Sequence, residues 1–269
     1  MRLMVIAIAL GLASPLAAQT PQQRPAPAAT PAAQQYAAAA RDMASRIDNR
    51  PATGAMPRTT DGQVAALIAI LSDRGNRFGT AAFPVQGVAS YQRVCSVPVV
   101  LTQQYARFGL DRRLAANADP ARRDAIVAQV ASANTRAYQN QVLPLLGFAI
   151  RCNALHVPAL EQVMTQPGLP PARRQALGGV RAALAQQIAT GLTTLAQPGI
   201  QPQHRAALLG RIAANAPALV RTMTLAQRDA LGVRVARYLA ASPPALRSDF
   251  ARLQGALGDR TCVALCRLP

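Results

Sequence analysis

The sequence contains no lysine and no tryptophan, and it has only one glutamate, Glu161, and two histidines, His156 and His204. A glycosidase needs a pair of carboxylates, and a Ser-His-Asp triad needs a histidine held by a positioned carboxylate. A hydrolase would therefore need a deep pocket that gathers Glu161 or several aspartates. No Gly-x-Ser-x-Gly motif and no glycine-rich phosphate loop is present. We expect a protein that is not an enzyme and that holds no cofactor.

The absence of lysine makes every one of the 29 basic residues an arginine, against 11 acidic residues and a net charge of +18. Such a charge favours anionic partners. However, the basic residues form no block of five or six, and the five tyrosines and five phenylalanines supply few surfaces on which bases could stack. We therefore expect no binding of nucleic acid. The composition of a GC-rich genome is an alternative explanation of the arginine excess.

Long apolar runs are also absent, apart from one at the start of the chain. Residues 1–18, "MRLMVIAIALGLASPLAA", have one basic residue, a short apolar core and small residues at the end, which is typical of a secretory signal peptide. The core is shorter than the roughly 20 residues that span a bilayer, although an uncleaved anchor is the alternative. Cleavage would leave no transmembrane segment. We expect a periplasmic or secreted protein.

The remaining chain is rich in alanine and nearly lacks strand-like alternation, which favours helices. Residues 19–35, rich in Pro, Ala and Gln, predict a flexible linker. A helical domain follows over 36–258, with a possible subdivision near 157–170, and a Cys-containing tail covers 259–269. The short loops predict an all-α multi-helix antiparallel bundle or stacked helical hairpins. Helices are predicted over 34–47, 60–71, 88–108 (kinked at Pro98), 120–156 (bent at Pro144), 158–164, 172–195, 203–220, 225–240 and 244–257.

Four of these helix starts share a phrase, "DPARRDAI", "PPARRQAL", "QPQHRAAL" and "TLAQRDAL". Their first helical positions are 51, 31 and 23 residues apart, so they are not the constant period of a solenoid. Each phrase puts an arginine at the fourth helical position, where a cation opposes the helix dipole. Packing between helices or a shared basic face that binds anions would explain this placement. The arginines are Arg123, Arg174, Arg205 and Arg228.

An even number of cysteines in an exported chain predicts two disulfides. The four are Cys95, Cys152, Cys262 and Cys266. We favour the pairs Cys95–Cys152 and Cys262–Cys266. A regular helix would hold the last two sulfurs apart, and the tail would then be tied to Cys95 or Cys152 instead. The Cys-x-x-x-Cys pair could hold a soft metal when reduced, but it lacks a further ligand, so we expect no metal site.

The histidines are expected to be structural, with His156 half-buried near a helix end and His204 exposed. Together these features predict an exported, non-enzymatic helical binding or scaffold protein of the cell envelope. Its arginine-rich surface would engage anionic lipid, lipopolysaccharide or cell-wall polymer. The alternative is a periplasmic thiol-redox or metal-handling protein that uses Cys262 and Cys266. The sequence does not set the oligomeric state.

Overall fold

The computed structural model describes residues 29–51, 54–85, 87–111, 113 and 119–268, so the predicted signal peptide and most of the predicted linker lie outside the described residues. Within these ranges the only extended pairing is a pair of isolated bridges to Phe83. The predicted all-α fold is confirmed. The helices are α1 (Pro31–Asp48), α2 (Gly62–Leu71), α3 (Gly87–Ser90), α4 (Ser96–Arg107), α5 (Pro120–Ala137), α6 (Gln139–Met164), α7 (Pro171–Leu195), α8 (Pro202–Val220), α9 (Leu225–Ala240) and α10 (Arg247–Gly258).

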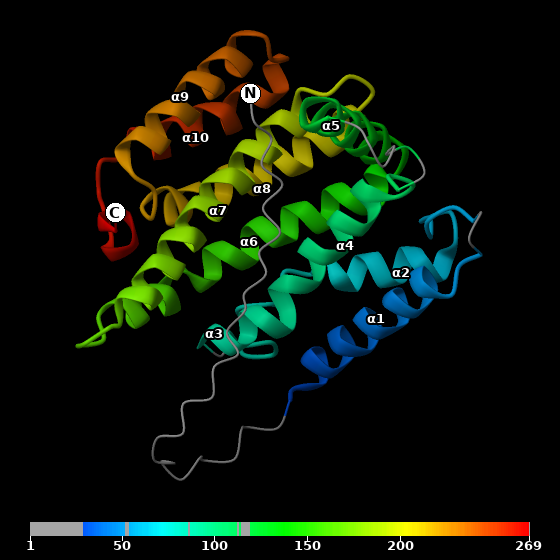
Figure 1. Cartoon of the computed structure of the whole chain (residues 1–269), viewed down its shortest axis with the longest axis horizontal. Coiled ribbons are helices and arrows are strands. Elements are labelled where there is room, and N and C mark those ends of the chain that lie inside the picture. Colours follow the sequence, from blue (N-terminus) through cyan, green and yellow to red (C-terminus); the bar gives the residue numbers. More distant parts are fainter. Residues whose placement is uncertain (1–28, 52–53, 86, 112, 114–118, 269) are drawn as a thin grey trace.

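The helices stack as antiparallel hairpins around α6, which crosses the middle of the molecule (Figure 1). On one side α6 packs against α4, and on the other it packs against α8. Beyond α8 lie α7 and α10, and α9 packs on α10. The hairpin of α1 and α2 lies on the opposite side of α6 from α8 to α10 (Figure 1). One continuous apolar core joins these layers.

Helix α6 is the central core element. Leu145, Phe148 and Ile150 are among its many buried residues. By length and composition it is also the described helix that could cross a membrane, but 72% of the window concerned is buried inside the fold. Burial between α4 and α8 therefore accounts for its apolar character.

Several helices begin where local capping places them. Helix α1 starts inside the segment expected to be a linker, because the Thr30 hydroxyl accepts the Ala33 N–H at 3.3 Å and Pro31 suits the first helical position. Helix α2 is capped by Asp61, whose carboxylate accepts the Gln63 N–H at 2.8 Å. Helix α9 begins with a capping box, in which Thr224 Oγ1 accepts the Gln227 N–H and Gln227 Oε1 accepts the Thr224 N–H.

The predicted long helix over 120–156 is two helices, which are separated at Tyr138. Tertiary contacts hold Tyr138 outside helical geometry: its hydroxyl accepts the Met56 N–H at 3.4 Å, and its ring lies 5.3 Å from that of Tyr105. Pro144 and Pro158 both lie inside α6. The predicted short helix over 158–164 is therefore the last part of α6, which ends at Met164.

The predicted helix over 88–108 also deviates before its proline. Residues Tyr91–Cys95 form a π-helical turn, in which the Ser96 N–H bonds to the Tyr91 carbonyl. Pro98 has no N–H to offer the Val94 carbonyl four residues earlier. That carbonyl instead accepts a 2.9 Å hydrogen bond from the Tyr36 hydroxyl of α1. The proline thus frees an acceptor that ties α1 to this segment.

The C-terminal tail is docked against the bundle. The Glu161 carboxylate of α6 accepts the N–H groups of Ala264 at 2.7 Å and Leu265 at 3.1 Å. The Arg181 guanidinium of α7 donates to the carbonyls of Leu265 and Leu268. A second, small apolar cluster lies beneath the tail. Its buried members are Leu169, Leu177, Leu265 and Leu268.

Candidate anion-binding site

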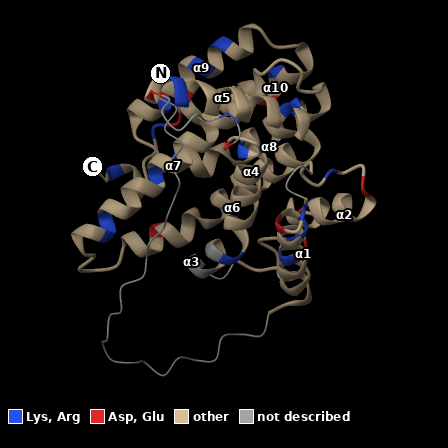
Figure 2. Cartoon of the chain, turned by 45° about the vertical axis from the view of Figure 1, so that its right-hand side comes forward, with Lys and Arg blue, Asp and Glu red and all other residues tan. Residues whose placement is uncertain are grey.

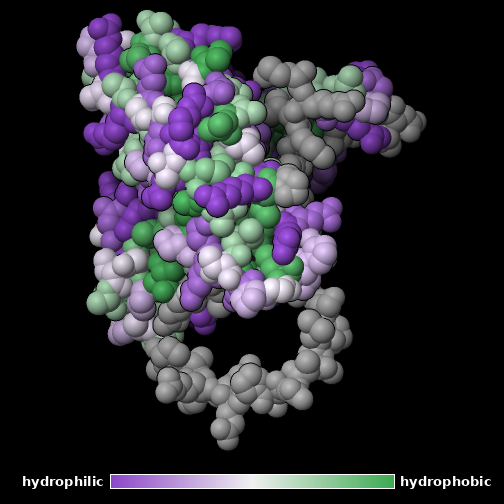
Figure 3. Space-filling view, turned by 90° about the vertical axis from the view of Figure 1, so that its left-hand side faces the viewer, coloured by the Kyte–Doolittle hydropathy of each residue, from purple (hydrophilic) through white to green (hydrophobic). Residues whose placement is uncertain are grey.

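The four arginines at the fourth helical position do not form one surface. Helices α7 and α8 are antiparallel, and the 25 residues of α7 extend over about 37 Å. Arg174 and Arg205 begin these two helices and therefore lie at opposite ends of the hairpin. Figure 2 shows basic residues on most helices, and Figure 3 shows hydrophilic and hydrophobic residues interspersed on another face. The hypothesis of a shared basic face is therefore wrong.

The individual environments of these arginines also differ. Arg123 and Arg174 are exposed on α5 and α7. Arg205 is half-buried, and its guanidinium donates to the Gln197 carbonyl at 2.8 Å, just beyond the end of α7. Arg228 is completely buried. An anion arriving from solvent could contact Arg123 or Arg174, but it could not reach Arg228.

Arg228 is a structural anchor for the chain that surrounds it. Its guanidinium donates to the carbonyls of Met223 and Thr261, at 3.2 and 2.7 Å, and to those of Arg221 and Asp259. Buried carbonyls need donors, and a forked guanidinium can serve several of them at once. This contact between the start of α9 and the tail explains why the helix tolerates a cation near its N-terminus.

A different set of residues lines the groove that we consider as a binding site. A groove of about 490 Å³ opens between α2, α6 and α8, a size typical of small-molecule sites. Ile68, Leu143 and Leu208, all buried, give it an apolar floor. Polar groups surround the floor. They are Thr59, Ser72, Arg74, Asn140, Gln203, His204 and Arg211.

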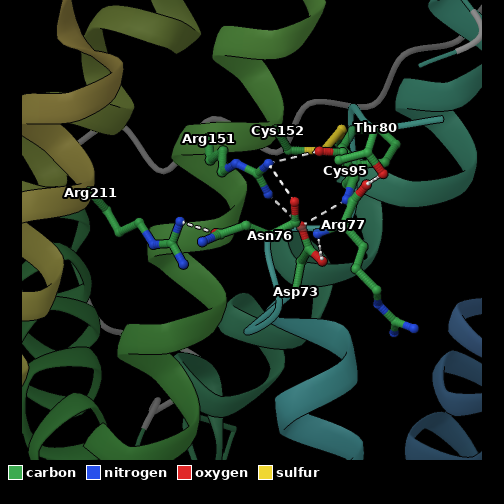
Figure 4. Close-up of polar contacts among 9 residues, drawn as sticks. Asp73, Asn76, Arg77, Thr80, Cys95, Arg151, Cys152 and Arg211 are labelled. Carbon is green, nitrogen blue, oxygen red and sulfur yellow. Dashed lines mark hydrogen bonds and ion pairs between the residues drawn. A yellow bond between two sulfur atoms is a disulfide. The ribbon is translucent and has the colours of Figure 1, made fainter. Parts of the chain in front are cut away.

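The loop after α2 holds a buried carboxylate, that of Asp73, beside this groove. Asp73 and Asn76 have positive φ values of 45° and 53°, which make the loop tight. The buried Asp73 carboxylate accepts the N–H groups of Arg77 at 2.8 Å and Phe78 at 3.0 Å, and it forms an ion pair with Arg151 (Figure 4). The Asp73 carboxylate therefore has Arg151 as its ion-pair partner and the loop N–H groups as its hydrogen-bond donors.

Arg211 of α8 differs from Arg151. In this loop the Arg211 guanidinium donates a hydrogen bond to a neutral amide, whereas Arg151 has a carboxylate partner. Arg211 Nη1 donates to Asn76 Oδ1 at 2.6 Å (Figure 4). Among the described residues, Arg211 has no carboxylate within 4.0 Å. Burial, and secondarily the charge of Arg151, lowers the pKa of Arg211, and the charge of Asp73 opposes this shift. Gly147 makes room for the side chain, since a Cβ there would lie 3.3 Å from Arg211 Cγ.

His204 lines the same groove and is half-buried, whereas the sequence suggested an exposed residue. Its Nε2 lies 2.6 Å from Asn140 Oδ1, an acceptor, so Nε2 carries a proton. Burial lowers the pKa of His204, which keeps the ring neutral at pH 7. The positive charge of the groove therefore comes from Arg211 and the exposed Arg74.

Both predicted disulfide pairs are present, Cys95–Cys152 and Cys262–Cys266. His156 is buried at 1% exposure instead of half-buried, because it stacks on Phe78 and its Nδ1 lies 3.4 Å from Cys95 Sγ. These two sulfurs and the imidazole are the one group of three possible metal ligands among the described residues. The sulfurs are bonded to each other, so they present no thiolates to a metal.

The remaining enzymatic hypothesis is a hydrolase that uses Glu161. This carboxylate accepts hydrogen bonds from two backbone N–H groups of the tail and does not line the groove.

No sequence motif marked Arg211, Asn76 or Gly147, because these residues meet only through the packing of α6, α8 and the loop after α2. Comparisons with protein families, curated proteins and solved structures find no match to this chain.

Proposed function

We propose that this protein binds an amphiphilic anion in the groove between α2, α6 and α8. The observation that carries the proposal is Arg211, a half-buried cation whose guanidinium donates to a neutral amide, that of Asn76. A buried charge is costly unless it is paired, so a carboxylate or phosphate in the groove would be strongly favoured. Such an anion would accept charge-assisted hydrogen bonds from Arg211.

The apolar floor specifies the rest of the ligand. Ile68, Leu143 and Leu208 would pack against an alkyl or acyl chain, while Arg211 and Arg74 hold the headgroup. Of the anionic envelope components considered from the sequence, lipid and the lipid part of lipopolysaccharide have this combination, and cell-wall polymer does not. The protein would thus be an exported, non-enzymatic binding protein of the cell envelope.

Calorimetry with dodecyl phosphate and with neutral dodecyl maltoside, both as monomers, tests this function. We expect the phosphate to bind more tightly. Arg211→Gln should weaken phosphate binding by about 10- to 100-fold, the value of a hydrogen bond to a charged group. Raising the salt concentration should weaken it further.

Arg174→Gln is the matched control, because Arg174 is an exposed arginine of α7 that does not line the groove. It should bind dodecyl phosphate as the unmodified protein does. Equal affinity for the two detergents, or an Arg211→Gln protein with undiminished affinity, would exclude the groove as an anion site.

A second candidate function is thiol–disulfide exchange at Cys262 and Cys266. A specific observation favours it: Arg228 Nη2 lies 4.0 Å from Cys266 Sγ, and a cation beside a sulfur stabilises its thiolate. The metal-handling version has less support, since no third ligand gathers with this pair among the described residues.

A further inference from the structure

The two sulfurs of the tail disulfide have different electrostatic environments. Arg228 lies beside Cys266, and the four carbonyls that accept its hydrogen bonds are neutral groups. The Asp259 carboxylate interacts with this guanidinium electrostatically, but in the described part of the chain no carboxylate lies within 4.0 Å of it. Its positive charge therefore acts on the nearby sulfur from a buried position, where solvent screens it poorly.

The two sulfurs also differ in access. Cys262 is half-buried, whereas Cys266 is 8% exposed and packs under the tail. A thiolate from another molecule can therefore reach Cys262 more readily. Exchange is fastest when the attacked sulfur is accessible and the departing sulfur is stabilised as a thiolate. Both conditions favour attack on Cys262 and departure of Cys266.

We propose that Cys262 is the sulfur attacked in exchange with an external dithiol, and that Cys266 is the leaving group, stabilised by Arg228. This inference rests on the second candidate function. The attacking thiolate forms a bond to Cys262 Sγ, the Cys262–Cys266 bond breaks, and its electron pair stays on Cys266 Sγ. The second thiol of the dithiol then displaces Cys262. The dithiol ends as a disulfide, and its two protons pass to the cysteines.

Reduction would leave the rest of the tail attachment in place. Glu161 and Arg181 contact residues 264, 265 and 268 through hydrogen bonds that do not involve sulfur. The Cys95–Cys152 bond should resist the same reagent, because both of its residues are almost completely buried. The structure thus assigns exchange to one of the two disulfides.

Peptide mapping of the full-length oxidised protein tests the direction without any substitution. Brief treatment with glutathione, followed by N-ethylmaleimide in acid, marks the mixed disulfide and the released thiol separately. Fragmentation of the peptide with both cysteines should locate glutathione on Cys262 and maleimide on Cys266. The opposite labelling would overturn the direction but leave exchange itself intact. No reduction of this pair by dithiothreitol under native conditions would overturn both.

Arg228→Met tests the role of the charge, with Arg267→Met as its matched control. Arg267 is adjacent to Cys266 in the chain but exposed. In a Cys262→Ser background, the pH dependence of Cys266 alkylation should give a thiol pKa below the usual value of about 8.5. Arg228→Met should raise this pKa by about one unit and slow reduction of the intact disulfide at least about threefold, whereas Arg267→Met should do neither. Equal effects of both substitutions would remove Arg228 from the mechanism.

Discussion

At the scale of single residues, buried polar side chains define this protein more than its many exposed arginines do. His156 is the strongest example, because it lies against the Cys95–Cys152 bond with its ring between Phe78 and Tyr91. Its Nδ1 lies 2.9 Å from the Cys152 carbonyl, which fixes the ring within α6. Its Nε2 has no hydrogen-bond partner among the described residues.

Burial lowers the pKa of His156, and this should make stability depend on pH. Above the unfolded value of 6.5, the imidazole is neutral in both states and costs nothing. Below it, the unfolded chain takes up a proton that the folded chain refuses, so the free energy of unfolding falls by up to about 1.4 kcal/mol per pH unit. Urea denaturation at pH 7 and pH 5 should show this loss.

His156→Gln should be less stable at pH 7 but should lose less on acidification. His204 has a lowered pKa as well, but it is half-buried at the groove, so His204→Gln should keep most of the acid sensitivity. If His156→Gln lost as much stability between pH 7 and pH 5 as the unmodified protein, another group would have to carry the pH dependence.

At the scale of elements, close helix packing decides which glycines are needed. Gly191 lies where α7 meets α8: a Cβ there would be 2.9 Å from Ile212 Cδ1 and 3.7 Å from Ile150 Cδ1. Gly232 of α9 provides a contrast, since a Cβ there meets nothing within 4 Å. Both are helical glycines, so intrinsic propensity affects them alike.

Gly191→Ala should therefore destabilise the protein by about 1–2 kcal/mol, because the added methyl overpacks the contact. Gly232→Ala should stabilise it by about 0.5–1 kcal/mol, since alanine loses less backbone entropy in a helix. Thermal or urea denaturation of the two variants gives this opposite pair of signs. The same sign for both would mean that the α7–α8 contact does not constrain position 191.

The sequence predicted elements well where local chemistry sets them and poorly where tertiary contacts do. Helix α9 has the predicted bounds because Thr224 and Gln227 satisfy its first N–H groups within the segment itself. The break at Tyr138 depends on residues 56 and 105, which no local pattern reveals. Pro158 was predicted to begin a separate helix, but it lies inside α6, where the residues on either side of it are part of one continuous helix.

At the scale of the whole molecule, Cys95–Cys152 joins the segment before α4 to the central helix across 57 positions of sequence. A cross-link over a loop of this length restricts the unfolded chain strongly. Replacing both cysteines by alanine should lower the free energy of unfolding by about 4 kcal/mol in the chain-entropy model. Urea denaturation measures the change.

Replacing Cys262 and Cys266 by alanine serves as the comparison, since this pair spans only four positions. Its effect on unfolding should be about half as large by the same model. A larger loss from the tail pair than from Cys95–Cys152 would show that contacts of the tail, and not chain entropy, dominate its stability.

The candidate site was less predictable than the fold. Composition indicated anionic partners, but the arginines chosen by their shared helix position lie apart, and one of them is buried. The groove depends on the packing of the Arg211 side chain against Gly147 and on the ion pair between Asp73 and Arg151. These are relations between side chains on separate elements, so a single sequence without motifs cannot reveal them.

The unequal spans of the two disulfides have a consequence for how the protein could be used repeatedly. A bond that closes a four-residue separation can be opened and remade while both cysteines stay near each other, held by the docked tail. The bond across 57 positions has no such freedom, since opening it would loosen the middle of the bundle. If Cys262 and Cys266 exchange as proposed, this disulfide could open and close many times in one folded molecule, while Cys95–Cys152 stays closed.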